Sequence, residues 1–144
     1  MFALRMLALV VFLATFVTAQ NHSANLTITI RGVRNDSGSV LAAVYDADKS
    51  FMKVQLAKAT LKAKANKGEV EFVVHDLHAG KYAVSVFHDE NDNGKLDKNW
   101  MGIPTEGYGF SNDARGNLGP PKFTQAAFDF DGNSSKSIDV SLHY

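Results

Sequence analysis

The stretch DENDNGKLD, Asp89–Asp97, holds the residues of this chain best suited to binding a metal ion. Its acids and amides alternate as in the D-x-[DN]-x-[DN]-G pattern, in which alternate oxygens surround calcium and a glycine permits the sharp turn. Because two of the ligand side chains are amides, the site carries less charge than one built of carboxylates alone, and the expected binding of calcium is weak, with a Kd of about 0.1 to 1 mM. The candidate ligands are Asp89, Asn91, Asn93, the carbonyl group of Lys95, and Asp97.

The same stretch also fits a metal-free turn. An EF-hand needs a glutamate at position 12, where this chain has Trp100, and a helix before the loop, where it has the strand-like YAVSVF. A calcium site would therefore need another ligand, for which Glu106 and Asp113 are the nearby candidates. Asn93-Gly94 is a favoured pair in tight hairpin turns, and such turns need no metal. Both interpretations stay open from the sequence.

The wider segment from Asp89 to Lys122 has no strand alternation and predicts one long connection. Loops of this length in a compact domain are uncommon, and they are usually functional or disordered. The segment contains the only tryptophan, all three prolines and six of the eleven glycines. Disordered segments are poor in aromatic residues, so we expect an ordered loop that binds a ligand or partner. The candidate ligand-binding residues are His88, Trp100, Glu106, Tyr108, Phe110 and Arg115.

The aromatic residues of this segment allow two interpretations. Trp100, Tyr108 and Phe110 could form an exposed platform for a sugar or a peptide, or they could pack as a small core under the loop. A catalytic site is a further alternative, with a base, acids and a nucleophile drawn from His88, Asp89, Glu106, Ser111 and Arg115. No catalytic spacing joins these residues, and the serine lies in Gly-Phe-Ser-Asn, outside a G-x-S-x-G turn.

Apolar residues at every second position predict the strands that must hold this segment. The alternation is clear in residues 26–30, 70–74, 82–86 and 138–142, and a more continuous apolar run covers 39–47. Residues 57–64 alternate weakly and carry lysines, which is typical of an edge strand. Turn signals separate the runs at regular intervals. This pattern predicts an all-β antiparallel sandwich of seven or eight strands, with a short helix or irregular connection at residues 48–54.

The first twenty residues, MFALRMLALVVFLATFVTAQ, predict an export signal. An early Arg5, an apolar run and the small-residue pattern Val17-Thr18-Ala19 are typical of a secretory signal peptide at residues 1–19. We expect residues 20–144 to form one domain that is periplasmic or secreted, with no membrane span. This part has 14 basic and 15 acidic residues, and its near-zero charge argues against nucleic acid or an anionic membrane as the main partner.

The residues from Asp76 to Asp113 also resemble a known family. The stretches LHAGKYA, HDENDNGKLD and GIPTEGYGFS match the motifs of the exported bacterial family catalogued as domain of unknown function 2141. The L-x-x-G-x-Y element is similar to one in transthyretin-like and carboxypeptidase-regulatory-like β-sandwiches. The resemblance implies a β-sandwich from a bacterium and brings no established activity.

Together these patterns favour an exported, non-catalytic β-sandwich module. Its long 89–122 loop would bind a small molecule, a glycan or a protein, and calcium is a candidate stabilising ion. The alternative is a small extracytoplasmic hydrolase or isomerase that uses His88 and the neighbouring carboxylates. A third hypothesis is a structural envelope protein in which the loop only caps the sandwich.

Overall fold

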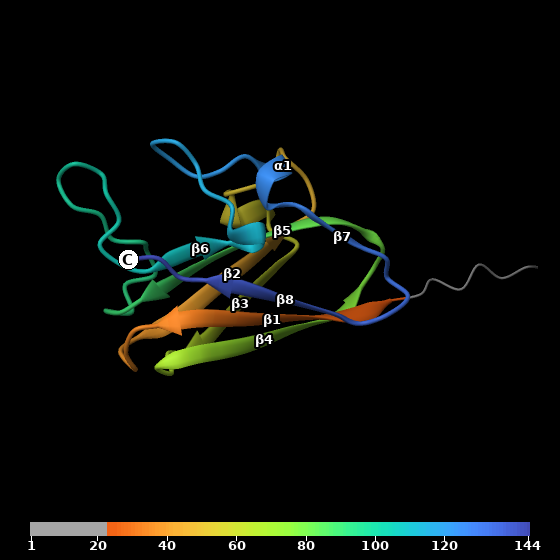
Figure 1. The fold of residues 1–144 in the computed structure, drawn as a ribbon, viewed down its shortest axis with the longest axis horizontal. Helices are drawn as coiled ribbons and strands as arrows, with labels where there is room; N and C mark the ends of the chain where they lie inside the picture. Colours follow the sequence, from red (N-terminus) through yellow and green to blue (C-terminus); the bar gives the residue numbers. More distant parts are fainter. Residues whose placement is uncertain (1–22) are drawn as a thin grey trace, which may run out of the picture.

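The structure is a computed structural model that describes residues 23–144, so the predicted signal peptide lies outside the described residues. Eight strands form two facing sheets, which confirms the predicted β-sandwich (Figure 1). One sheet has the order β4-β1-β8, and the other has the order β3-β2-β5-β6 with β7 also paired to β5. The strands are β1 (Ala24–Val33), β2 (Ser39–Tyr45), β3 (Ala59–Lys64), β4 (Gly68–Leu77), β5 (Gly80–Asp89), β6 (Tyr108–Phe110), β7 (Phe128–Phe130) and β8 (Lys136–Ser141).

The main core lies between the sheets and follows the alternation in the sequence. Leu26, Ile28 and Ile30 of β1 are fully buried, whereas the threonines between them face outward and are only partly buried. Burying each of these apolar side chains stabilises the fold by about 1.5–3 kcal/mol. β3 forms an edge of the five-stranded sheet, as its lysines predicted.

The continuous apolar run of β2 has a separate cause, because both of its faces are covered. Val40, Ala42 and Val44 face the main core. Ala43 and Tyr45 face a second, smaller core on the outer side of the five-stranded sheet, together with Phe110 and Phe123. A strand that is buried on both faces has no exposed side on which to place polar residues.

One strand pair departs from the predicted antiparallel arrangement. β1 pairs with β4 in antiparallel fashion, but it pairs with β8 in parallel, with Leu26 opposite Lys136 and Arg31 opposite Ser141. The reason is that the chain crosses between the sheets after β7. It therefore enters β8 at the end of the sandwich where β1 begins.

The prediction of one strandless loop over residues 89–122 was wrong. Asp89 closes β5, and β6 pairs with the same strand through Ser85 opposite Phe110 and Phe87 opposite Tyr108. β6 has three residues around a central glycine, which is too short to show alternation. It divides the segment into a first excursion, residues 90–107, and a second excursion, residues 114–122, and Figure 1 shows both extending from the sandwich.

The remaining elements are short. The helix expected at residues 48–54 is a pair of turns followed by a single 3-10 turn, η1 (Val54–Leu56). A second 3-10 turn, η2 (Ser111–Asp113), follows β6, and one turn of α-helix, α1 (Phe123–Ala126), precedes β7. Neither α1 nor β7 was predicted. Within residues 23–144, no helix has the length and apolar character needed to cross a membrane.

Candidate functional site

The acidic stretch folds around the carboxylate of Asp89, which is fully buried at the end of β5. Its Oδ1 accepts a hydrogen bond from the backbone N–H of Asn93 at 3.0 Å, and its Oδ2 accepts one from the N–H of Gly94 at 2.7 Å. Gly94 adopts a φ of 77°, a backbone conformation that glycine adopts freely. A buried carboxylate is tolerated when donors surround it, and here the turn itself supplies them.

Glu106 fastens the other side of the first excursion. This buried side chain accepts a hydrogen bond from the N–H of Glu90 at 2.8 Å and one from the N–H of Asp97 at 3.0 Å. One carboxylate therefore joins the outgoing and the returning chain. We call this arrangement the base of the first excursion; it consists of Asp89, Asn93, Gly94, Asp97 and Glu106.

The predicted calcium ligands lie in or next to the base and form hydrogen bonds with one another. Asp97 accepts hydrogen bonds from the side-chain amides of Asn91 at 2.7 Å and of Asn93 at 2.9 and 3.0 Å. The N–H of Lys95 donates to Asn93 Oδ1 at 2.9 Å. Residues 23–144 contain no group of three or more histidine, cysteine or acidic side chains placed to hold a metal ion. These contacts do not test calcium binding, which stays a prediction.

The two acids considered as extra ligands have other partners. Glu106 belongs to the base, as described above. Asp113 lies beside β8, where its Oδ1 accepts a hydrogen bond from His143 Nε2 at 2.8 Å, and this bond holds the pKa of Asp113 below its usual value. Arg115 Nη2 lies 2.9 Å from the same histidine nitrogen. Sequence reasoning missed this cluster, because no motif links His143 to residues thirty positions earlier.

His88 is buried and both of its ring nitrogens are engaged. Nε2 lies 2.7 Å from the carbonyl oxygen of Ser37, and since a carbonyl only accepts, Nε2 carries the proton. In the neutral ring Nδ1 then accepts from the Tyr144 hydroxyl, which lies 2.8 Å away and itself accepts the N–H of Arg34 at 3.1 Å. This chain of hydrogen bonds joins β5 to the residues that flank β1 and β8.

Charged neighbours complete the network around His88. The guanidinium of Arg34 lies over the Tyr144 ring, 4.4 Å from its centroid, and its Nη2 is 2.6 Å from Glu90 Oε1. Burial alone would raise the pKa of Glu90, but hydrogen bonds from Asn35 and Arg34 outweigh it and hold this pKa below its ordinary value of 4.5. Burial raises the pKa of the Tyr144 hydroxyl.

The far end of the first excursion is a hairpin turn with exposed apolar side chains. Asn99 closes it: its N–H donates to the carbonyl of Ile103 at 2.9 Å, and its Oδ1 accepts the N–H groups of Met101 at 2.9 Å and of Ile103 at 3.0 Å. Trp100 is 91% exposed, Met101 57% and Ile103 53%. We call residues Trp100–Ile103 the tip.

The three aromatic residues predicted to bind a ligand do not form one platform. Trp100 is exposed at the tip. Phe110 is buried in the second core, where its ring centroid lies 6.2 Å from that of Phe51, and Tyr108 is half-buried beside it. The sequence allowed an exposed platform or a small core. Phe110 and Tyr108 pack as a small core, whereas Trp100 does not belong to it.

The five residues considered for catalysis do not all lie together: Asp89 and Glu106 belong to the base and His88 directly precedes Asp89, whereas Ser111 and Arg115 have other partners. Ser111 is buried; its Oγ donates to the carbonyl of Ala126 at 2.6 Å and accepts the N–H of Val84 at 2.9 Å. Arg115 lies with His143 and Asp113. Within the described residues, Ser111 and Arg115 form no hydrogen bond with His88, Asp89 or Glu106.

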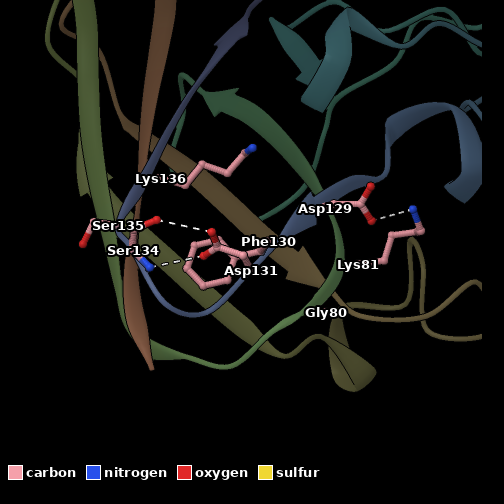
Figure 2. Close-up of a pocket in the computed structure, with 8 residues that line it drawn as sticks. All are labelled: Gly80, Lys81, Asp129, Phe130, Asp131, Ser134, Ser135 and Lys136. Atoms are coloured by element: carbon pink, nitrogen blue, oxygen red, sulfur yellow. Dashed lines mark hydrogen bonds and ion pairs between the residues drawn. The ribbon is translucent and has the colours of Figure 1, made fainter. Parts of the chain in front are cut away.

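A pocket of about 550 Å³ lies between β7 and the start of β8, at the end of β5 away from the first excursion (Figure 2). Phe130 lies buried beside it, and Lys81 Nζ pairs with Asp129 Oδ1 at 2.7 Å. Asp131 accepts the N–H groups of Asn133 at 2.9 Å and Ser134 at 3.2 Å. Lys81 therefore offsets the charge of Asp129, and backbone N–H groups stabilise the carboxylate of Asp131.

The fold is a β-sandwich domain that carries two glycine-containing excursions. The model of the family described as "Uncharacterized protein conserved in bacteria (DUF2141)" matches residues 28–139. The chain belongs to this family, which confirms the resemblance seen in its motifs. Comparisons with curated proteins and with solved structures find no match.

Proposed function

We propose that this chain is an exported, non-catalytic module that binds a partner through the tip of its first excursion. The observation that carries the proposal is the exposure of three large apolar side chains, Trp100, Met101 and Ile103, on one ordered turn. Single exposed apolar residues are common on protein surfaces. Several that gather at one place usually mark a binding site.

The base supports this role because it fixes the shape of the tip before any partner arrives. Glu106 joins the two arms, and Asn99 closes the turn with its own side chain. A preformed contact loses less conformational entropy on binding than a flexible one. Tryptophan is also enriched among the residues that dominate binding energy, and truncating such a residue costs about 2 kcal/mol or more.

The burial of the polar side chains supports a non-catalytic role over the hydrolase or isomerase alternative. His88 has no free ring nitrogen, Ser111 is held by two backbone groups, and Glu106 is committed to two N–H groups. A general base must reach the proton that it removes. These groups would have to give up their structural hydrogen bonds before they could act on a substrate.

Binding to the cell-envelope fraction of a bacterium that produces the chain tests the proposal. We expect the purified protein to co-sediment with this fraction, and the triple variant Trp100→Ala/Met101→Ser/Ile103→Ser to lose about tenfold or more in affinity. A matched control is Val54→Ser/Leu56→Ser, because these side chains are 55% and 56% exposed on η1, outside the loop. Equal binding by the triple variant and the wild type would overturn the proposal.

A further inference from the structure

The pocket shown in Figure 2 is a second candidate binding site, separate from the tip. Its lining includes Gly80 at the start of β5, whereas the first excursion begins after Asp89 at the other end of the same strand. Ten extended residues span about 30 Å, so a small ligand in the pocket lies far from the base. The volume of about 550 Å³ is typical of sites for small molecules.

Four charged side chains line the pocket, two of each sign. They are Lys81, Lys136, Asp129 and Asp131, so their formal charges sum to zero. Lys81 Nζ pairs with Asp129 Oδ1 at 2.7 Å. Within residues 23–144, neither Lys136 nor Asp131 has an ionic partner within 4.0 Å. The ammonium group of Lys136 and the carboxylate of Asp131 are therefore the charges that the pocket offers to a ligand.

Both of these groups can accommodate further hydrogen bonds. Asp131 Oδ1 accepts two backbone N–H groups, whereas Oδ2 accepts the Ser134 hydroxyl through a longer bond of 3.3 Å. A carboxylate oxygen has two lone pairs, so Oδ2 can accept a second donor. Lys136 Nζ has three N–H donors and lies 6.0 Å from the centroid of the Phe128 ring.

The electrostatics of the pocket disfavour a ligand with charge of one sign. A hydrogen bond from Lys81 lowers the pKa of Asp129, and the charge of Lys136 adds to this effect. The backbone N–H of Asn133 contributes most to lowering the pKa of Asp131, again with help from Lys136. Both carboxylates are therefore ionised at neutral pH. Two carboxylates repel a simple anion, and two ammonium groups repel a simple cation.

We propose that this pocket binds a small zwitterion, a molecule with one ammonium and one carboxylate group, such as a free amino acid or a short peptide. The ligand carboxylate contacts Lys136, and the ligand ammonium group donates to Asp131 Oδ2. Both contacts are hydrogen bonds between opposite charges, which are stronger than those between neutral groups. The proposal concerns a site of its own and does not depend on what the tip binds.

Other small molecules fit the lining less well. The flat face of a sugar stacks on an exposed aromatic ring, but Phe128 is 9% and Phe130 2% exposed. A divalent cation needs several oxygen ligands, and residues 23–144 hold no group of three or more histidine, cysteine or acidic side chains placed for one. A phosphate-bearing ligand would bring its negative charge beside two carboxylates. A zwitterion satisfies both signs at once.

Nuclear magnetic resonance is the suitable measurement, because exposed ion pairs contribute little and binding should be millimolar. The chain is labelled with the heavy isotope of nitrogen and titrated with L-alanine, L-alanyl-L-alanine, propionate and ethylamine. We expect saturable shifts in the amide signals of residues 129–136 with the zwitterions. The tighter of the two shows whether the site takes a free amino acid or a peptide. Propionate and ethylamine each lack one ion pair and should bind about two- to fivefold more weakly.

Two variants test the contacts separately. Lys136→Gln removes the ammonium group, and Asp131→Asn removes the carboxylate charge while it keeps an oxygen for the N–H groups of the turn. Each variant should bind the zwitterion about two- to fivefold more weakly than the wild type. The matched control is Lys67→Gln, at an exposed lysine in the turn before β4, which should bind like the wild type.

Several results would overturn the proposal. Amide signals of residues 129–136 that stay unchanged in both zwitterions would show that the pocket takes neither. Propionate or ethylamine binding as tightly as the zwitterions would reveal a site for a single charge. Wild-type affinity in Lys136→Gln or Asp131→Asn, or an equal loss in Lys67→Gln, would exclude the specific contacts. None of these results bears on the tip, so the proposed function is tested independently.

Discussion

The two ends of the first excursion use opposite kinds of residue for opposite purposes. At the base, Asp89 and Glu106 are buried, and each accepts two backbone hydrogen bonds. At the tip, Trp100 and Met101 are exposed. The acidic residues that the sequence marks as candidates for chemistry thus hold the backbone together, and the apolar residues face the solvent. The contrast separates stability from binding, so changes at the base should affect stability and changes at the tip should affect binding.

The largest effect is expected from Glu106→Ala. This change leaves the N–H groups of Glu90 and Asp97 without their acceptor, and it should lower the free energy of unfolding by about 2–3 kcal/mol in urea titration. Glu106→Gln keeps one oxygen acceptor and should lose less. If the free energy of unfolding of Glu106→Ala differs from that of the wild type by less than about 0.5 kcal/mol, the base does not fasten the excursion.

A similar contrast is expected between a glycine packed in a strand and a glycine in an open loop when each is replaced by alanine. A Cβ atom on Gly109 in β6 would lie 2.2 Å from the backbone oxygen of Ser141, so that the strand must move. We expect Gly109→Ala to destabilise the fold by about 1–3 kcal/mol. Gly119 in the second excursion has no atom within 4 Å of such a Cβ, and Gly119→Ala should change stability by less than about 0.5 kcal/mol. Equal midpoints in thermal unfolding would contradict the difference.

A smaller effect should appear in the pH dependence of the free energy of unfolding, through Glu90 at the start of the first excursion. Hydrogen bonds from Asn35 and Arg34 overcome the effect of burial and lower the pKa of Glu90 in the fold. Its ionised form therefore stabilises the fold above the ordinary pKa of 4.5, and this contribution disappears as the pH falls through the lower, folded value. The stability difference between wild type and Glu90→Gln should shrink below pH 4.5. A difference that stays constant in acid would show that Glu90 contributes no such linkage.

The smallest effect on stability is expected at the tip. Trp100 is 91% exposed, so the free energy of unfolding of Trp100→Ala should differ from that of the wild type by less than about 0.5 kcal/mol. Circular dichroism is the suitable measurement, because the variant has no tryptophan. A loss comparable to that of Glu106→Ala would mean that the tip packs against the domain, and the separation of binding from stability would fail.

The sequence predicts the strands far better than it predicts the loop. Alternation such as Leu26-Thr27-Ile28 reports burial on one face, and that periodicity found the sandwich. β6 was missed because a strand of three residues has no period to detect. The parallel entry of β8 depends on where the chain crosses between sheets, which local patterns do not encode.

The residues of the site were partly predictable for the same reason. The short-range pattern of Asp89, Asn91, Asn93 and Asp97 singled out residues that form hydrogen bonds with one another, and whether they bind calcium stays a prediction. The different environments of Trp100 and Phe110 were not readable, since exposure of an aromatic side chain depends on what packs over it. The contacts of His143 with Asp113 and Arg115 join distant segments and had no signal in the sequence.

The parallel pair of β1 and β8 also bears on how the chain folds. Leu26 and Lys136 lie opposite each other although 110 positions separate them along the chain. The three-stranded sheet therefore cannot be completed until nearly the whole polypeptide is available. Because closing so long a loop costs entropy before the pairing stabilises it, folding should be slow relative to domains built from local hairpins. Until β8 docks, one edge of β1 is left open to pairing with other chains.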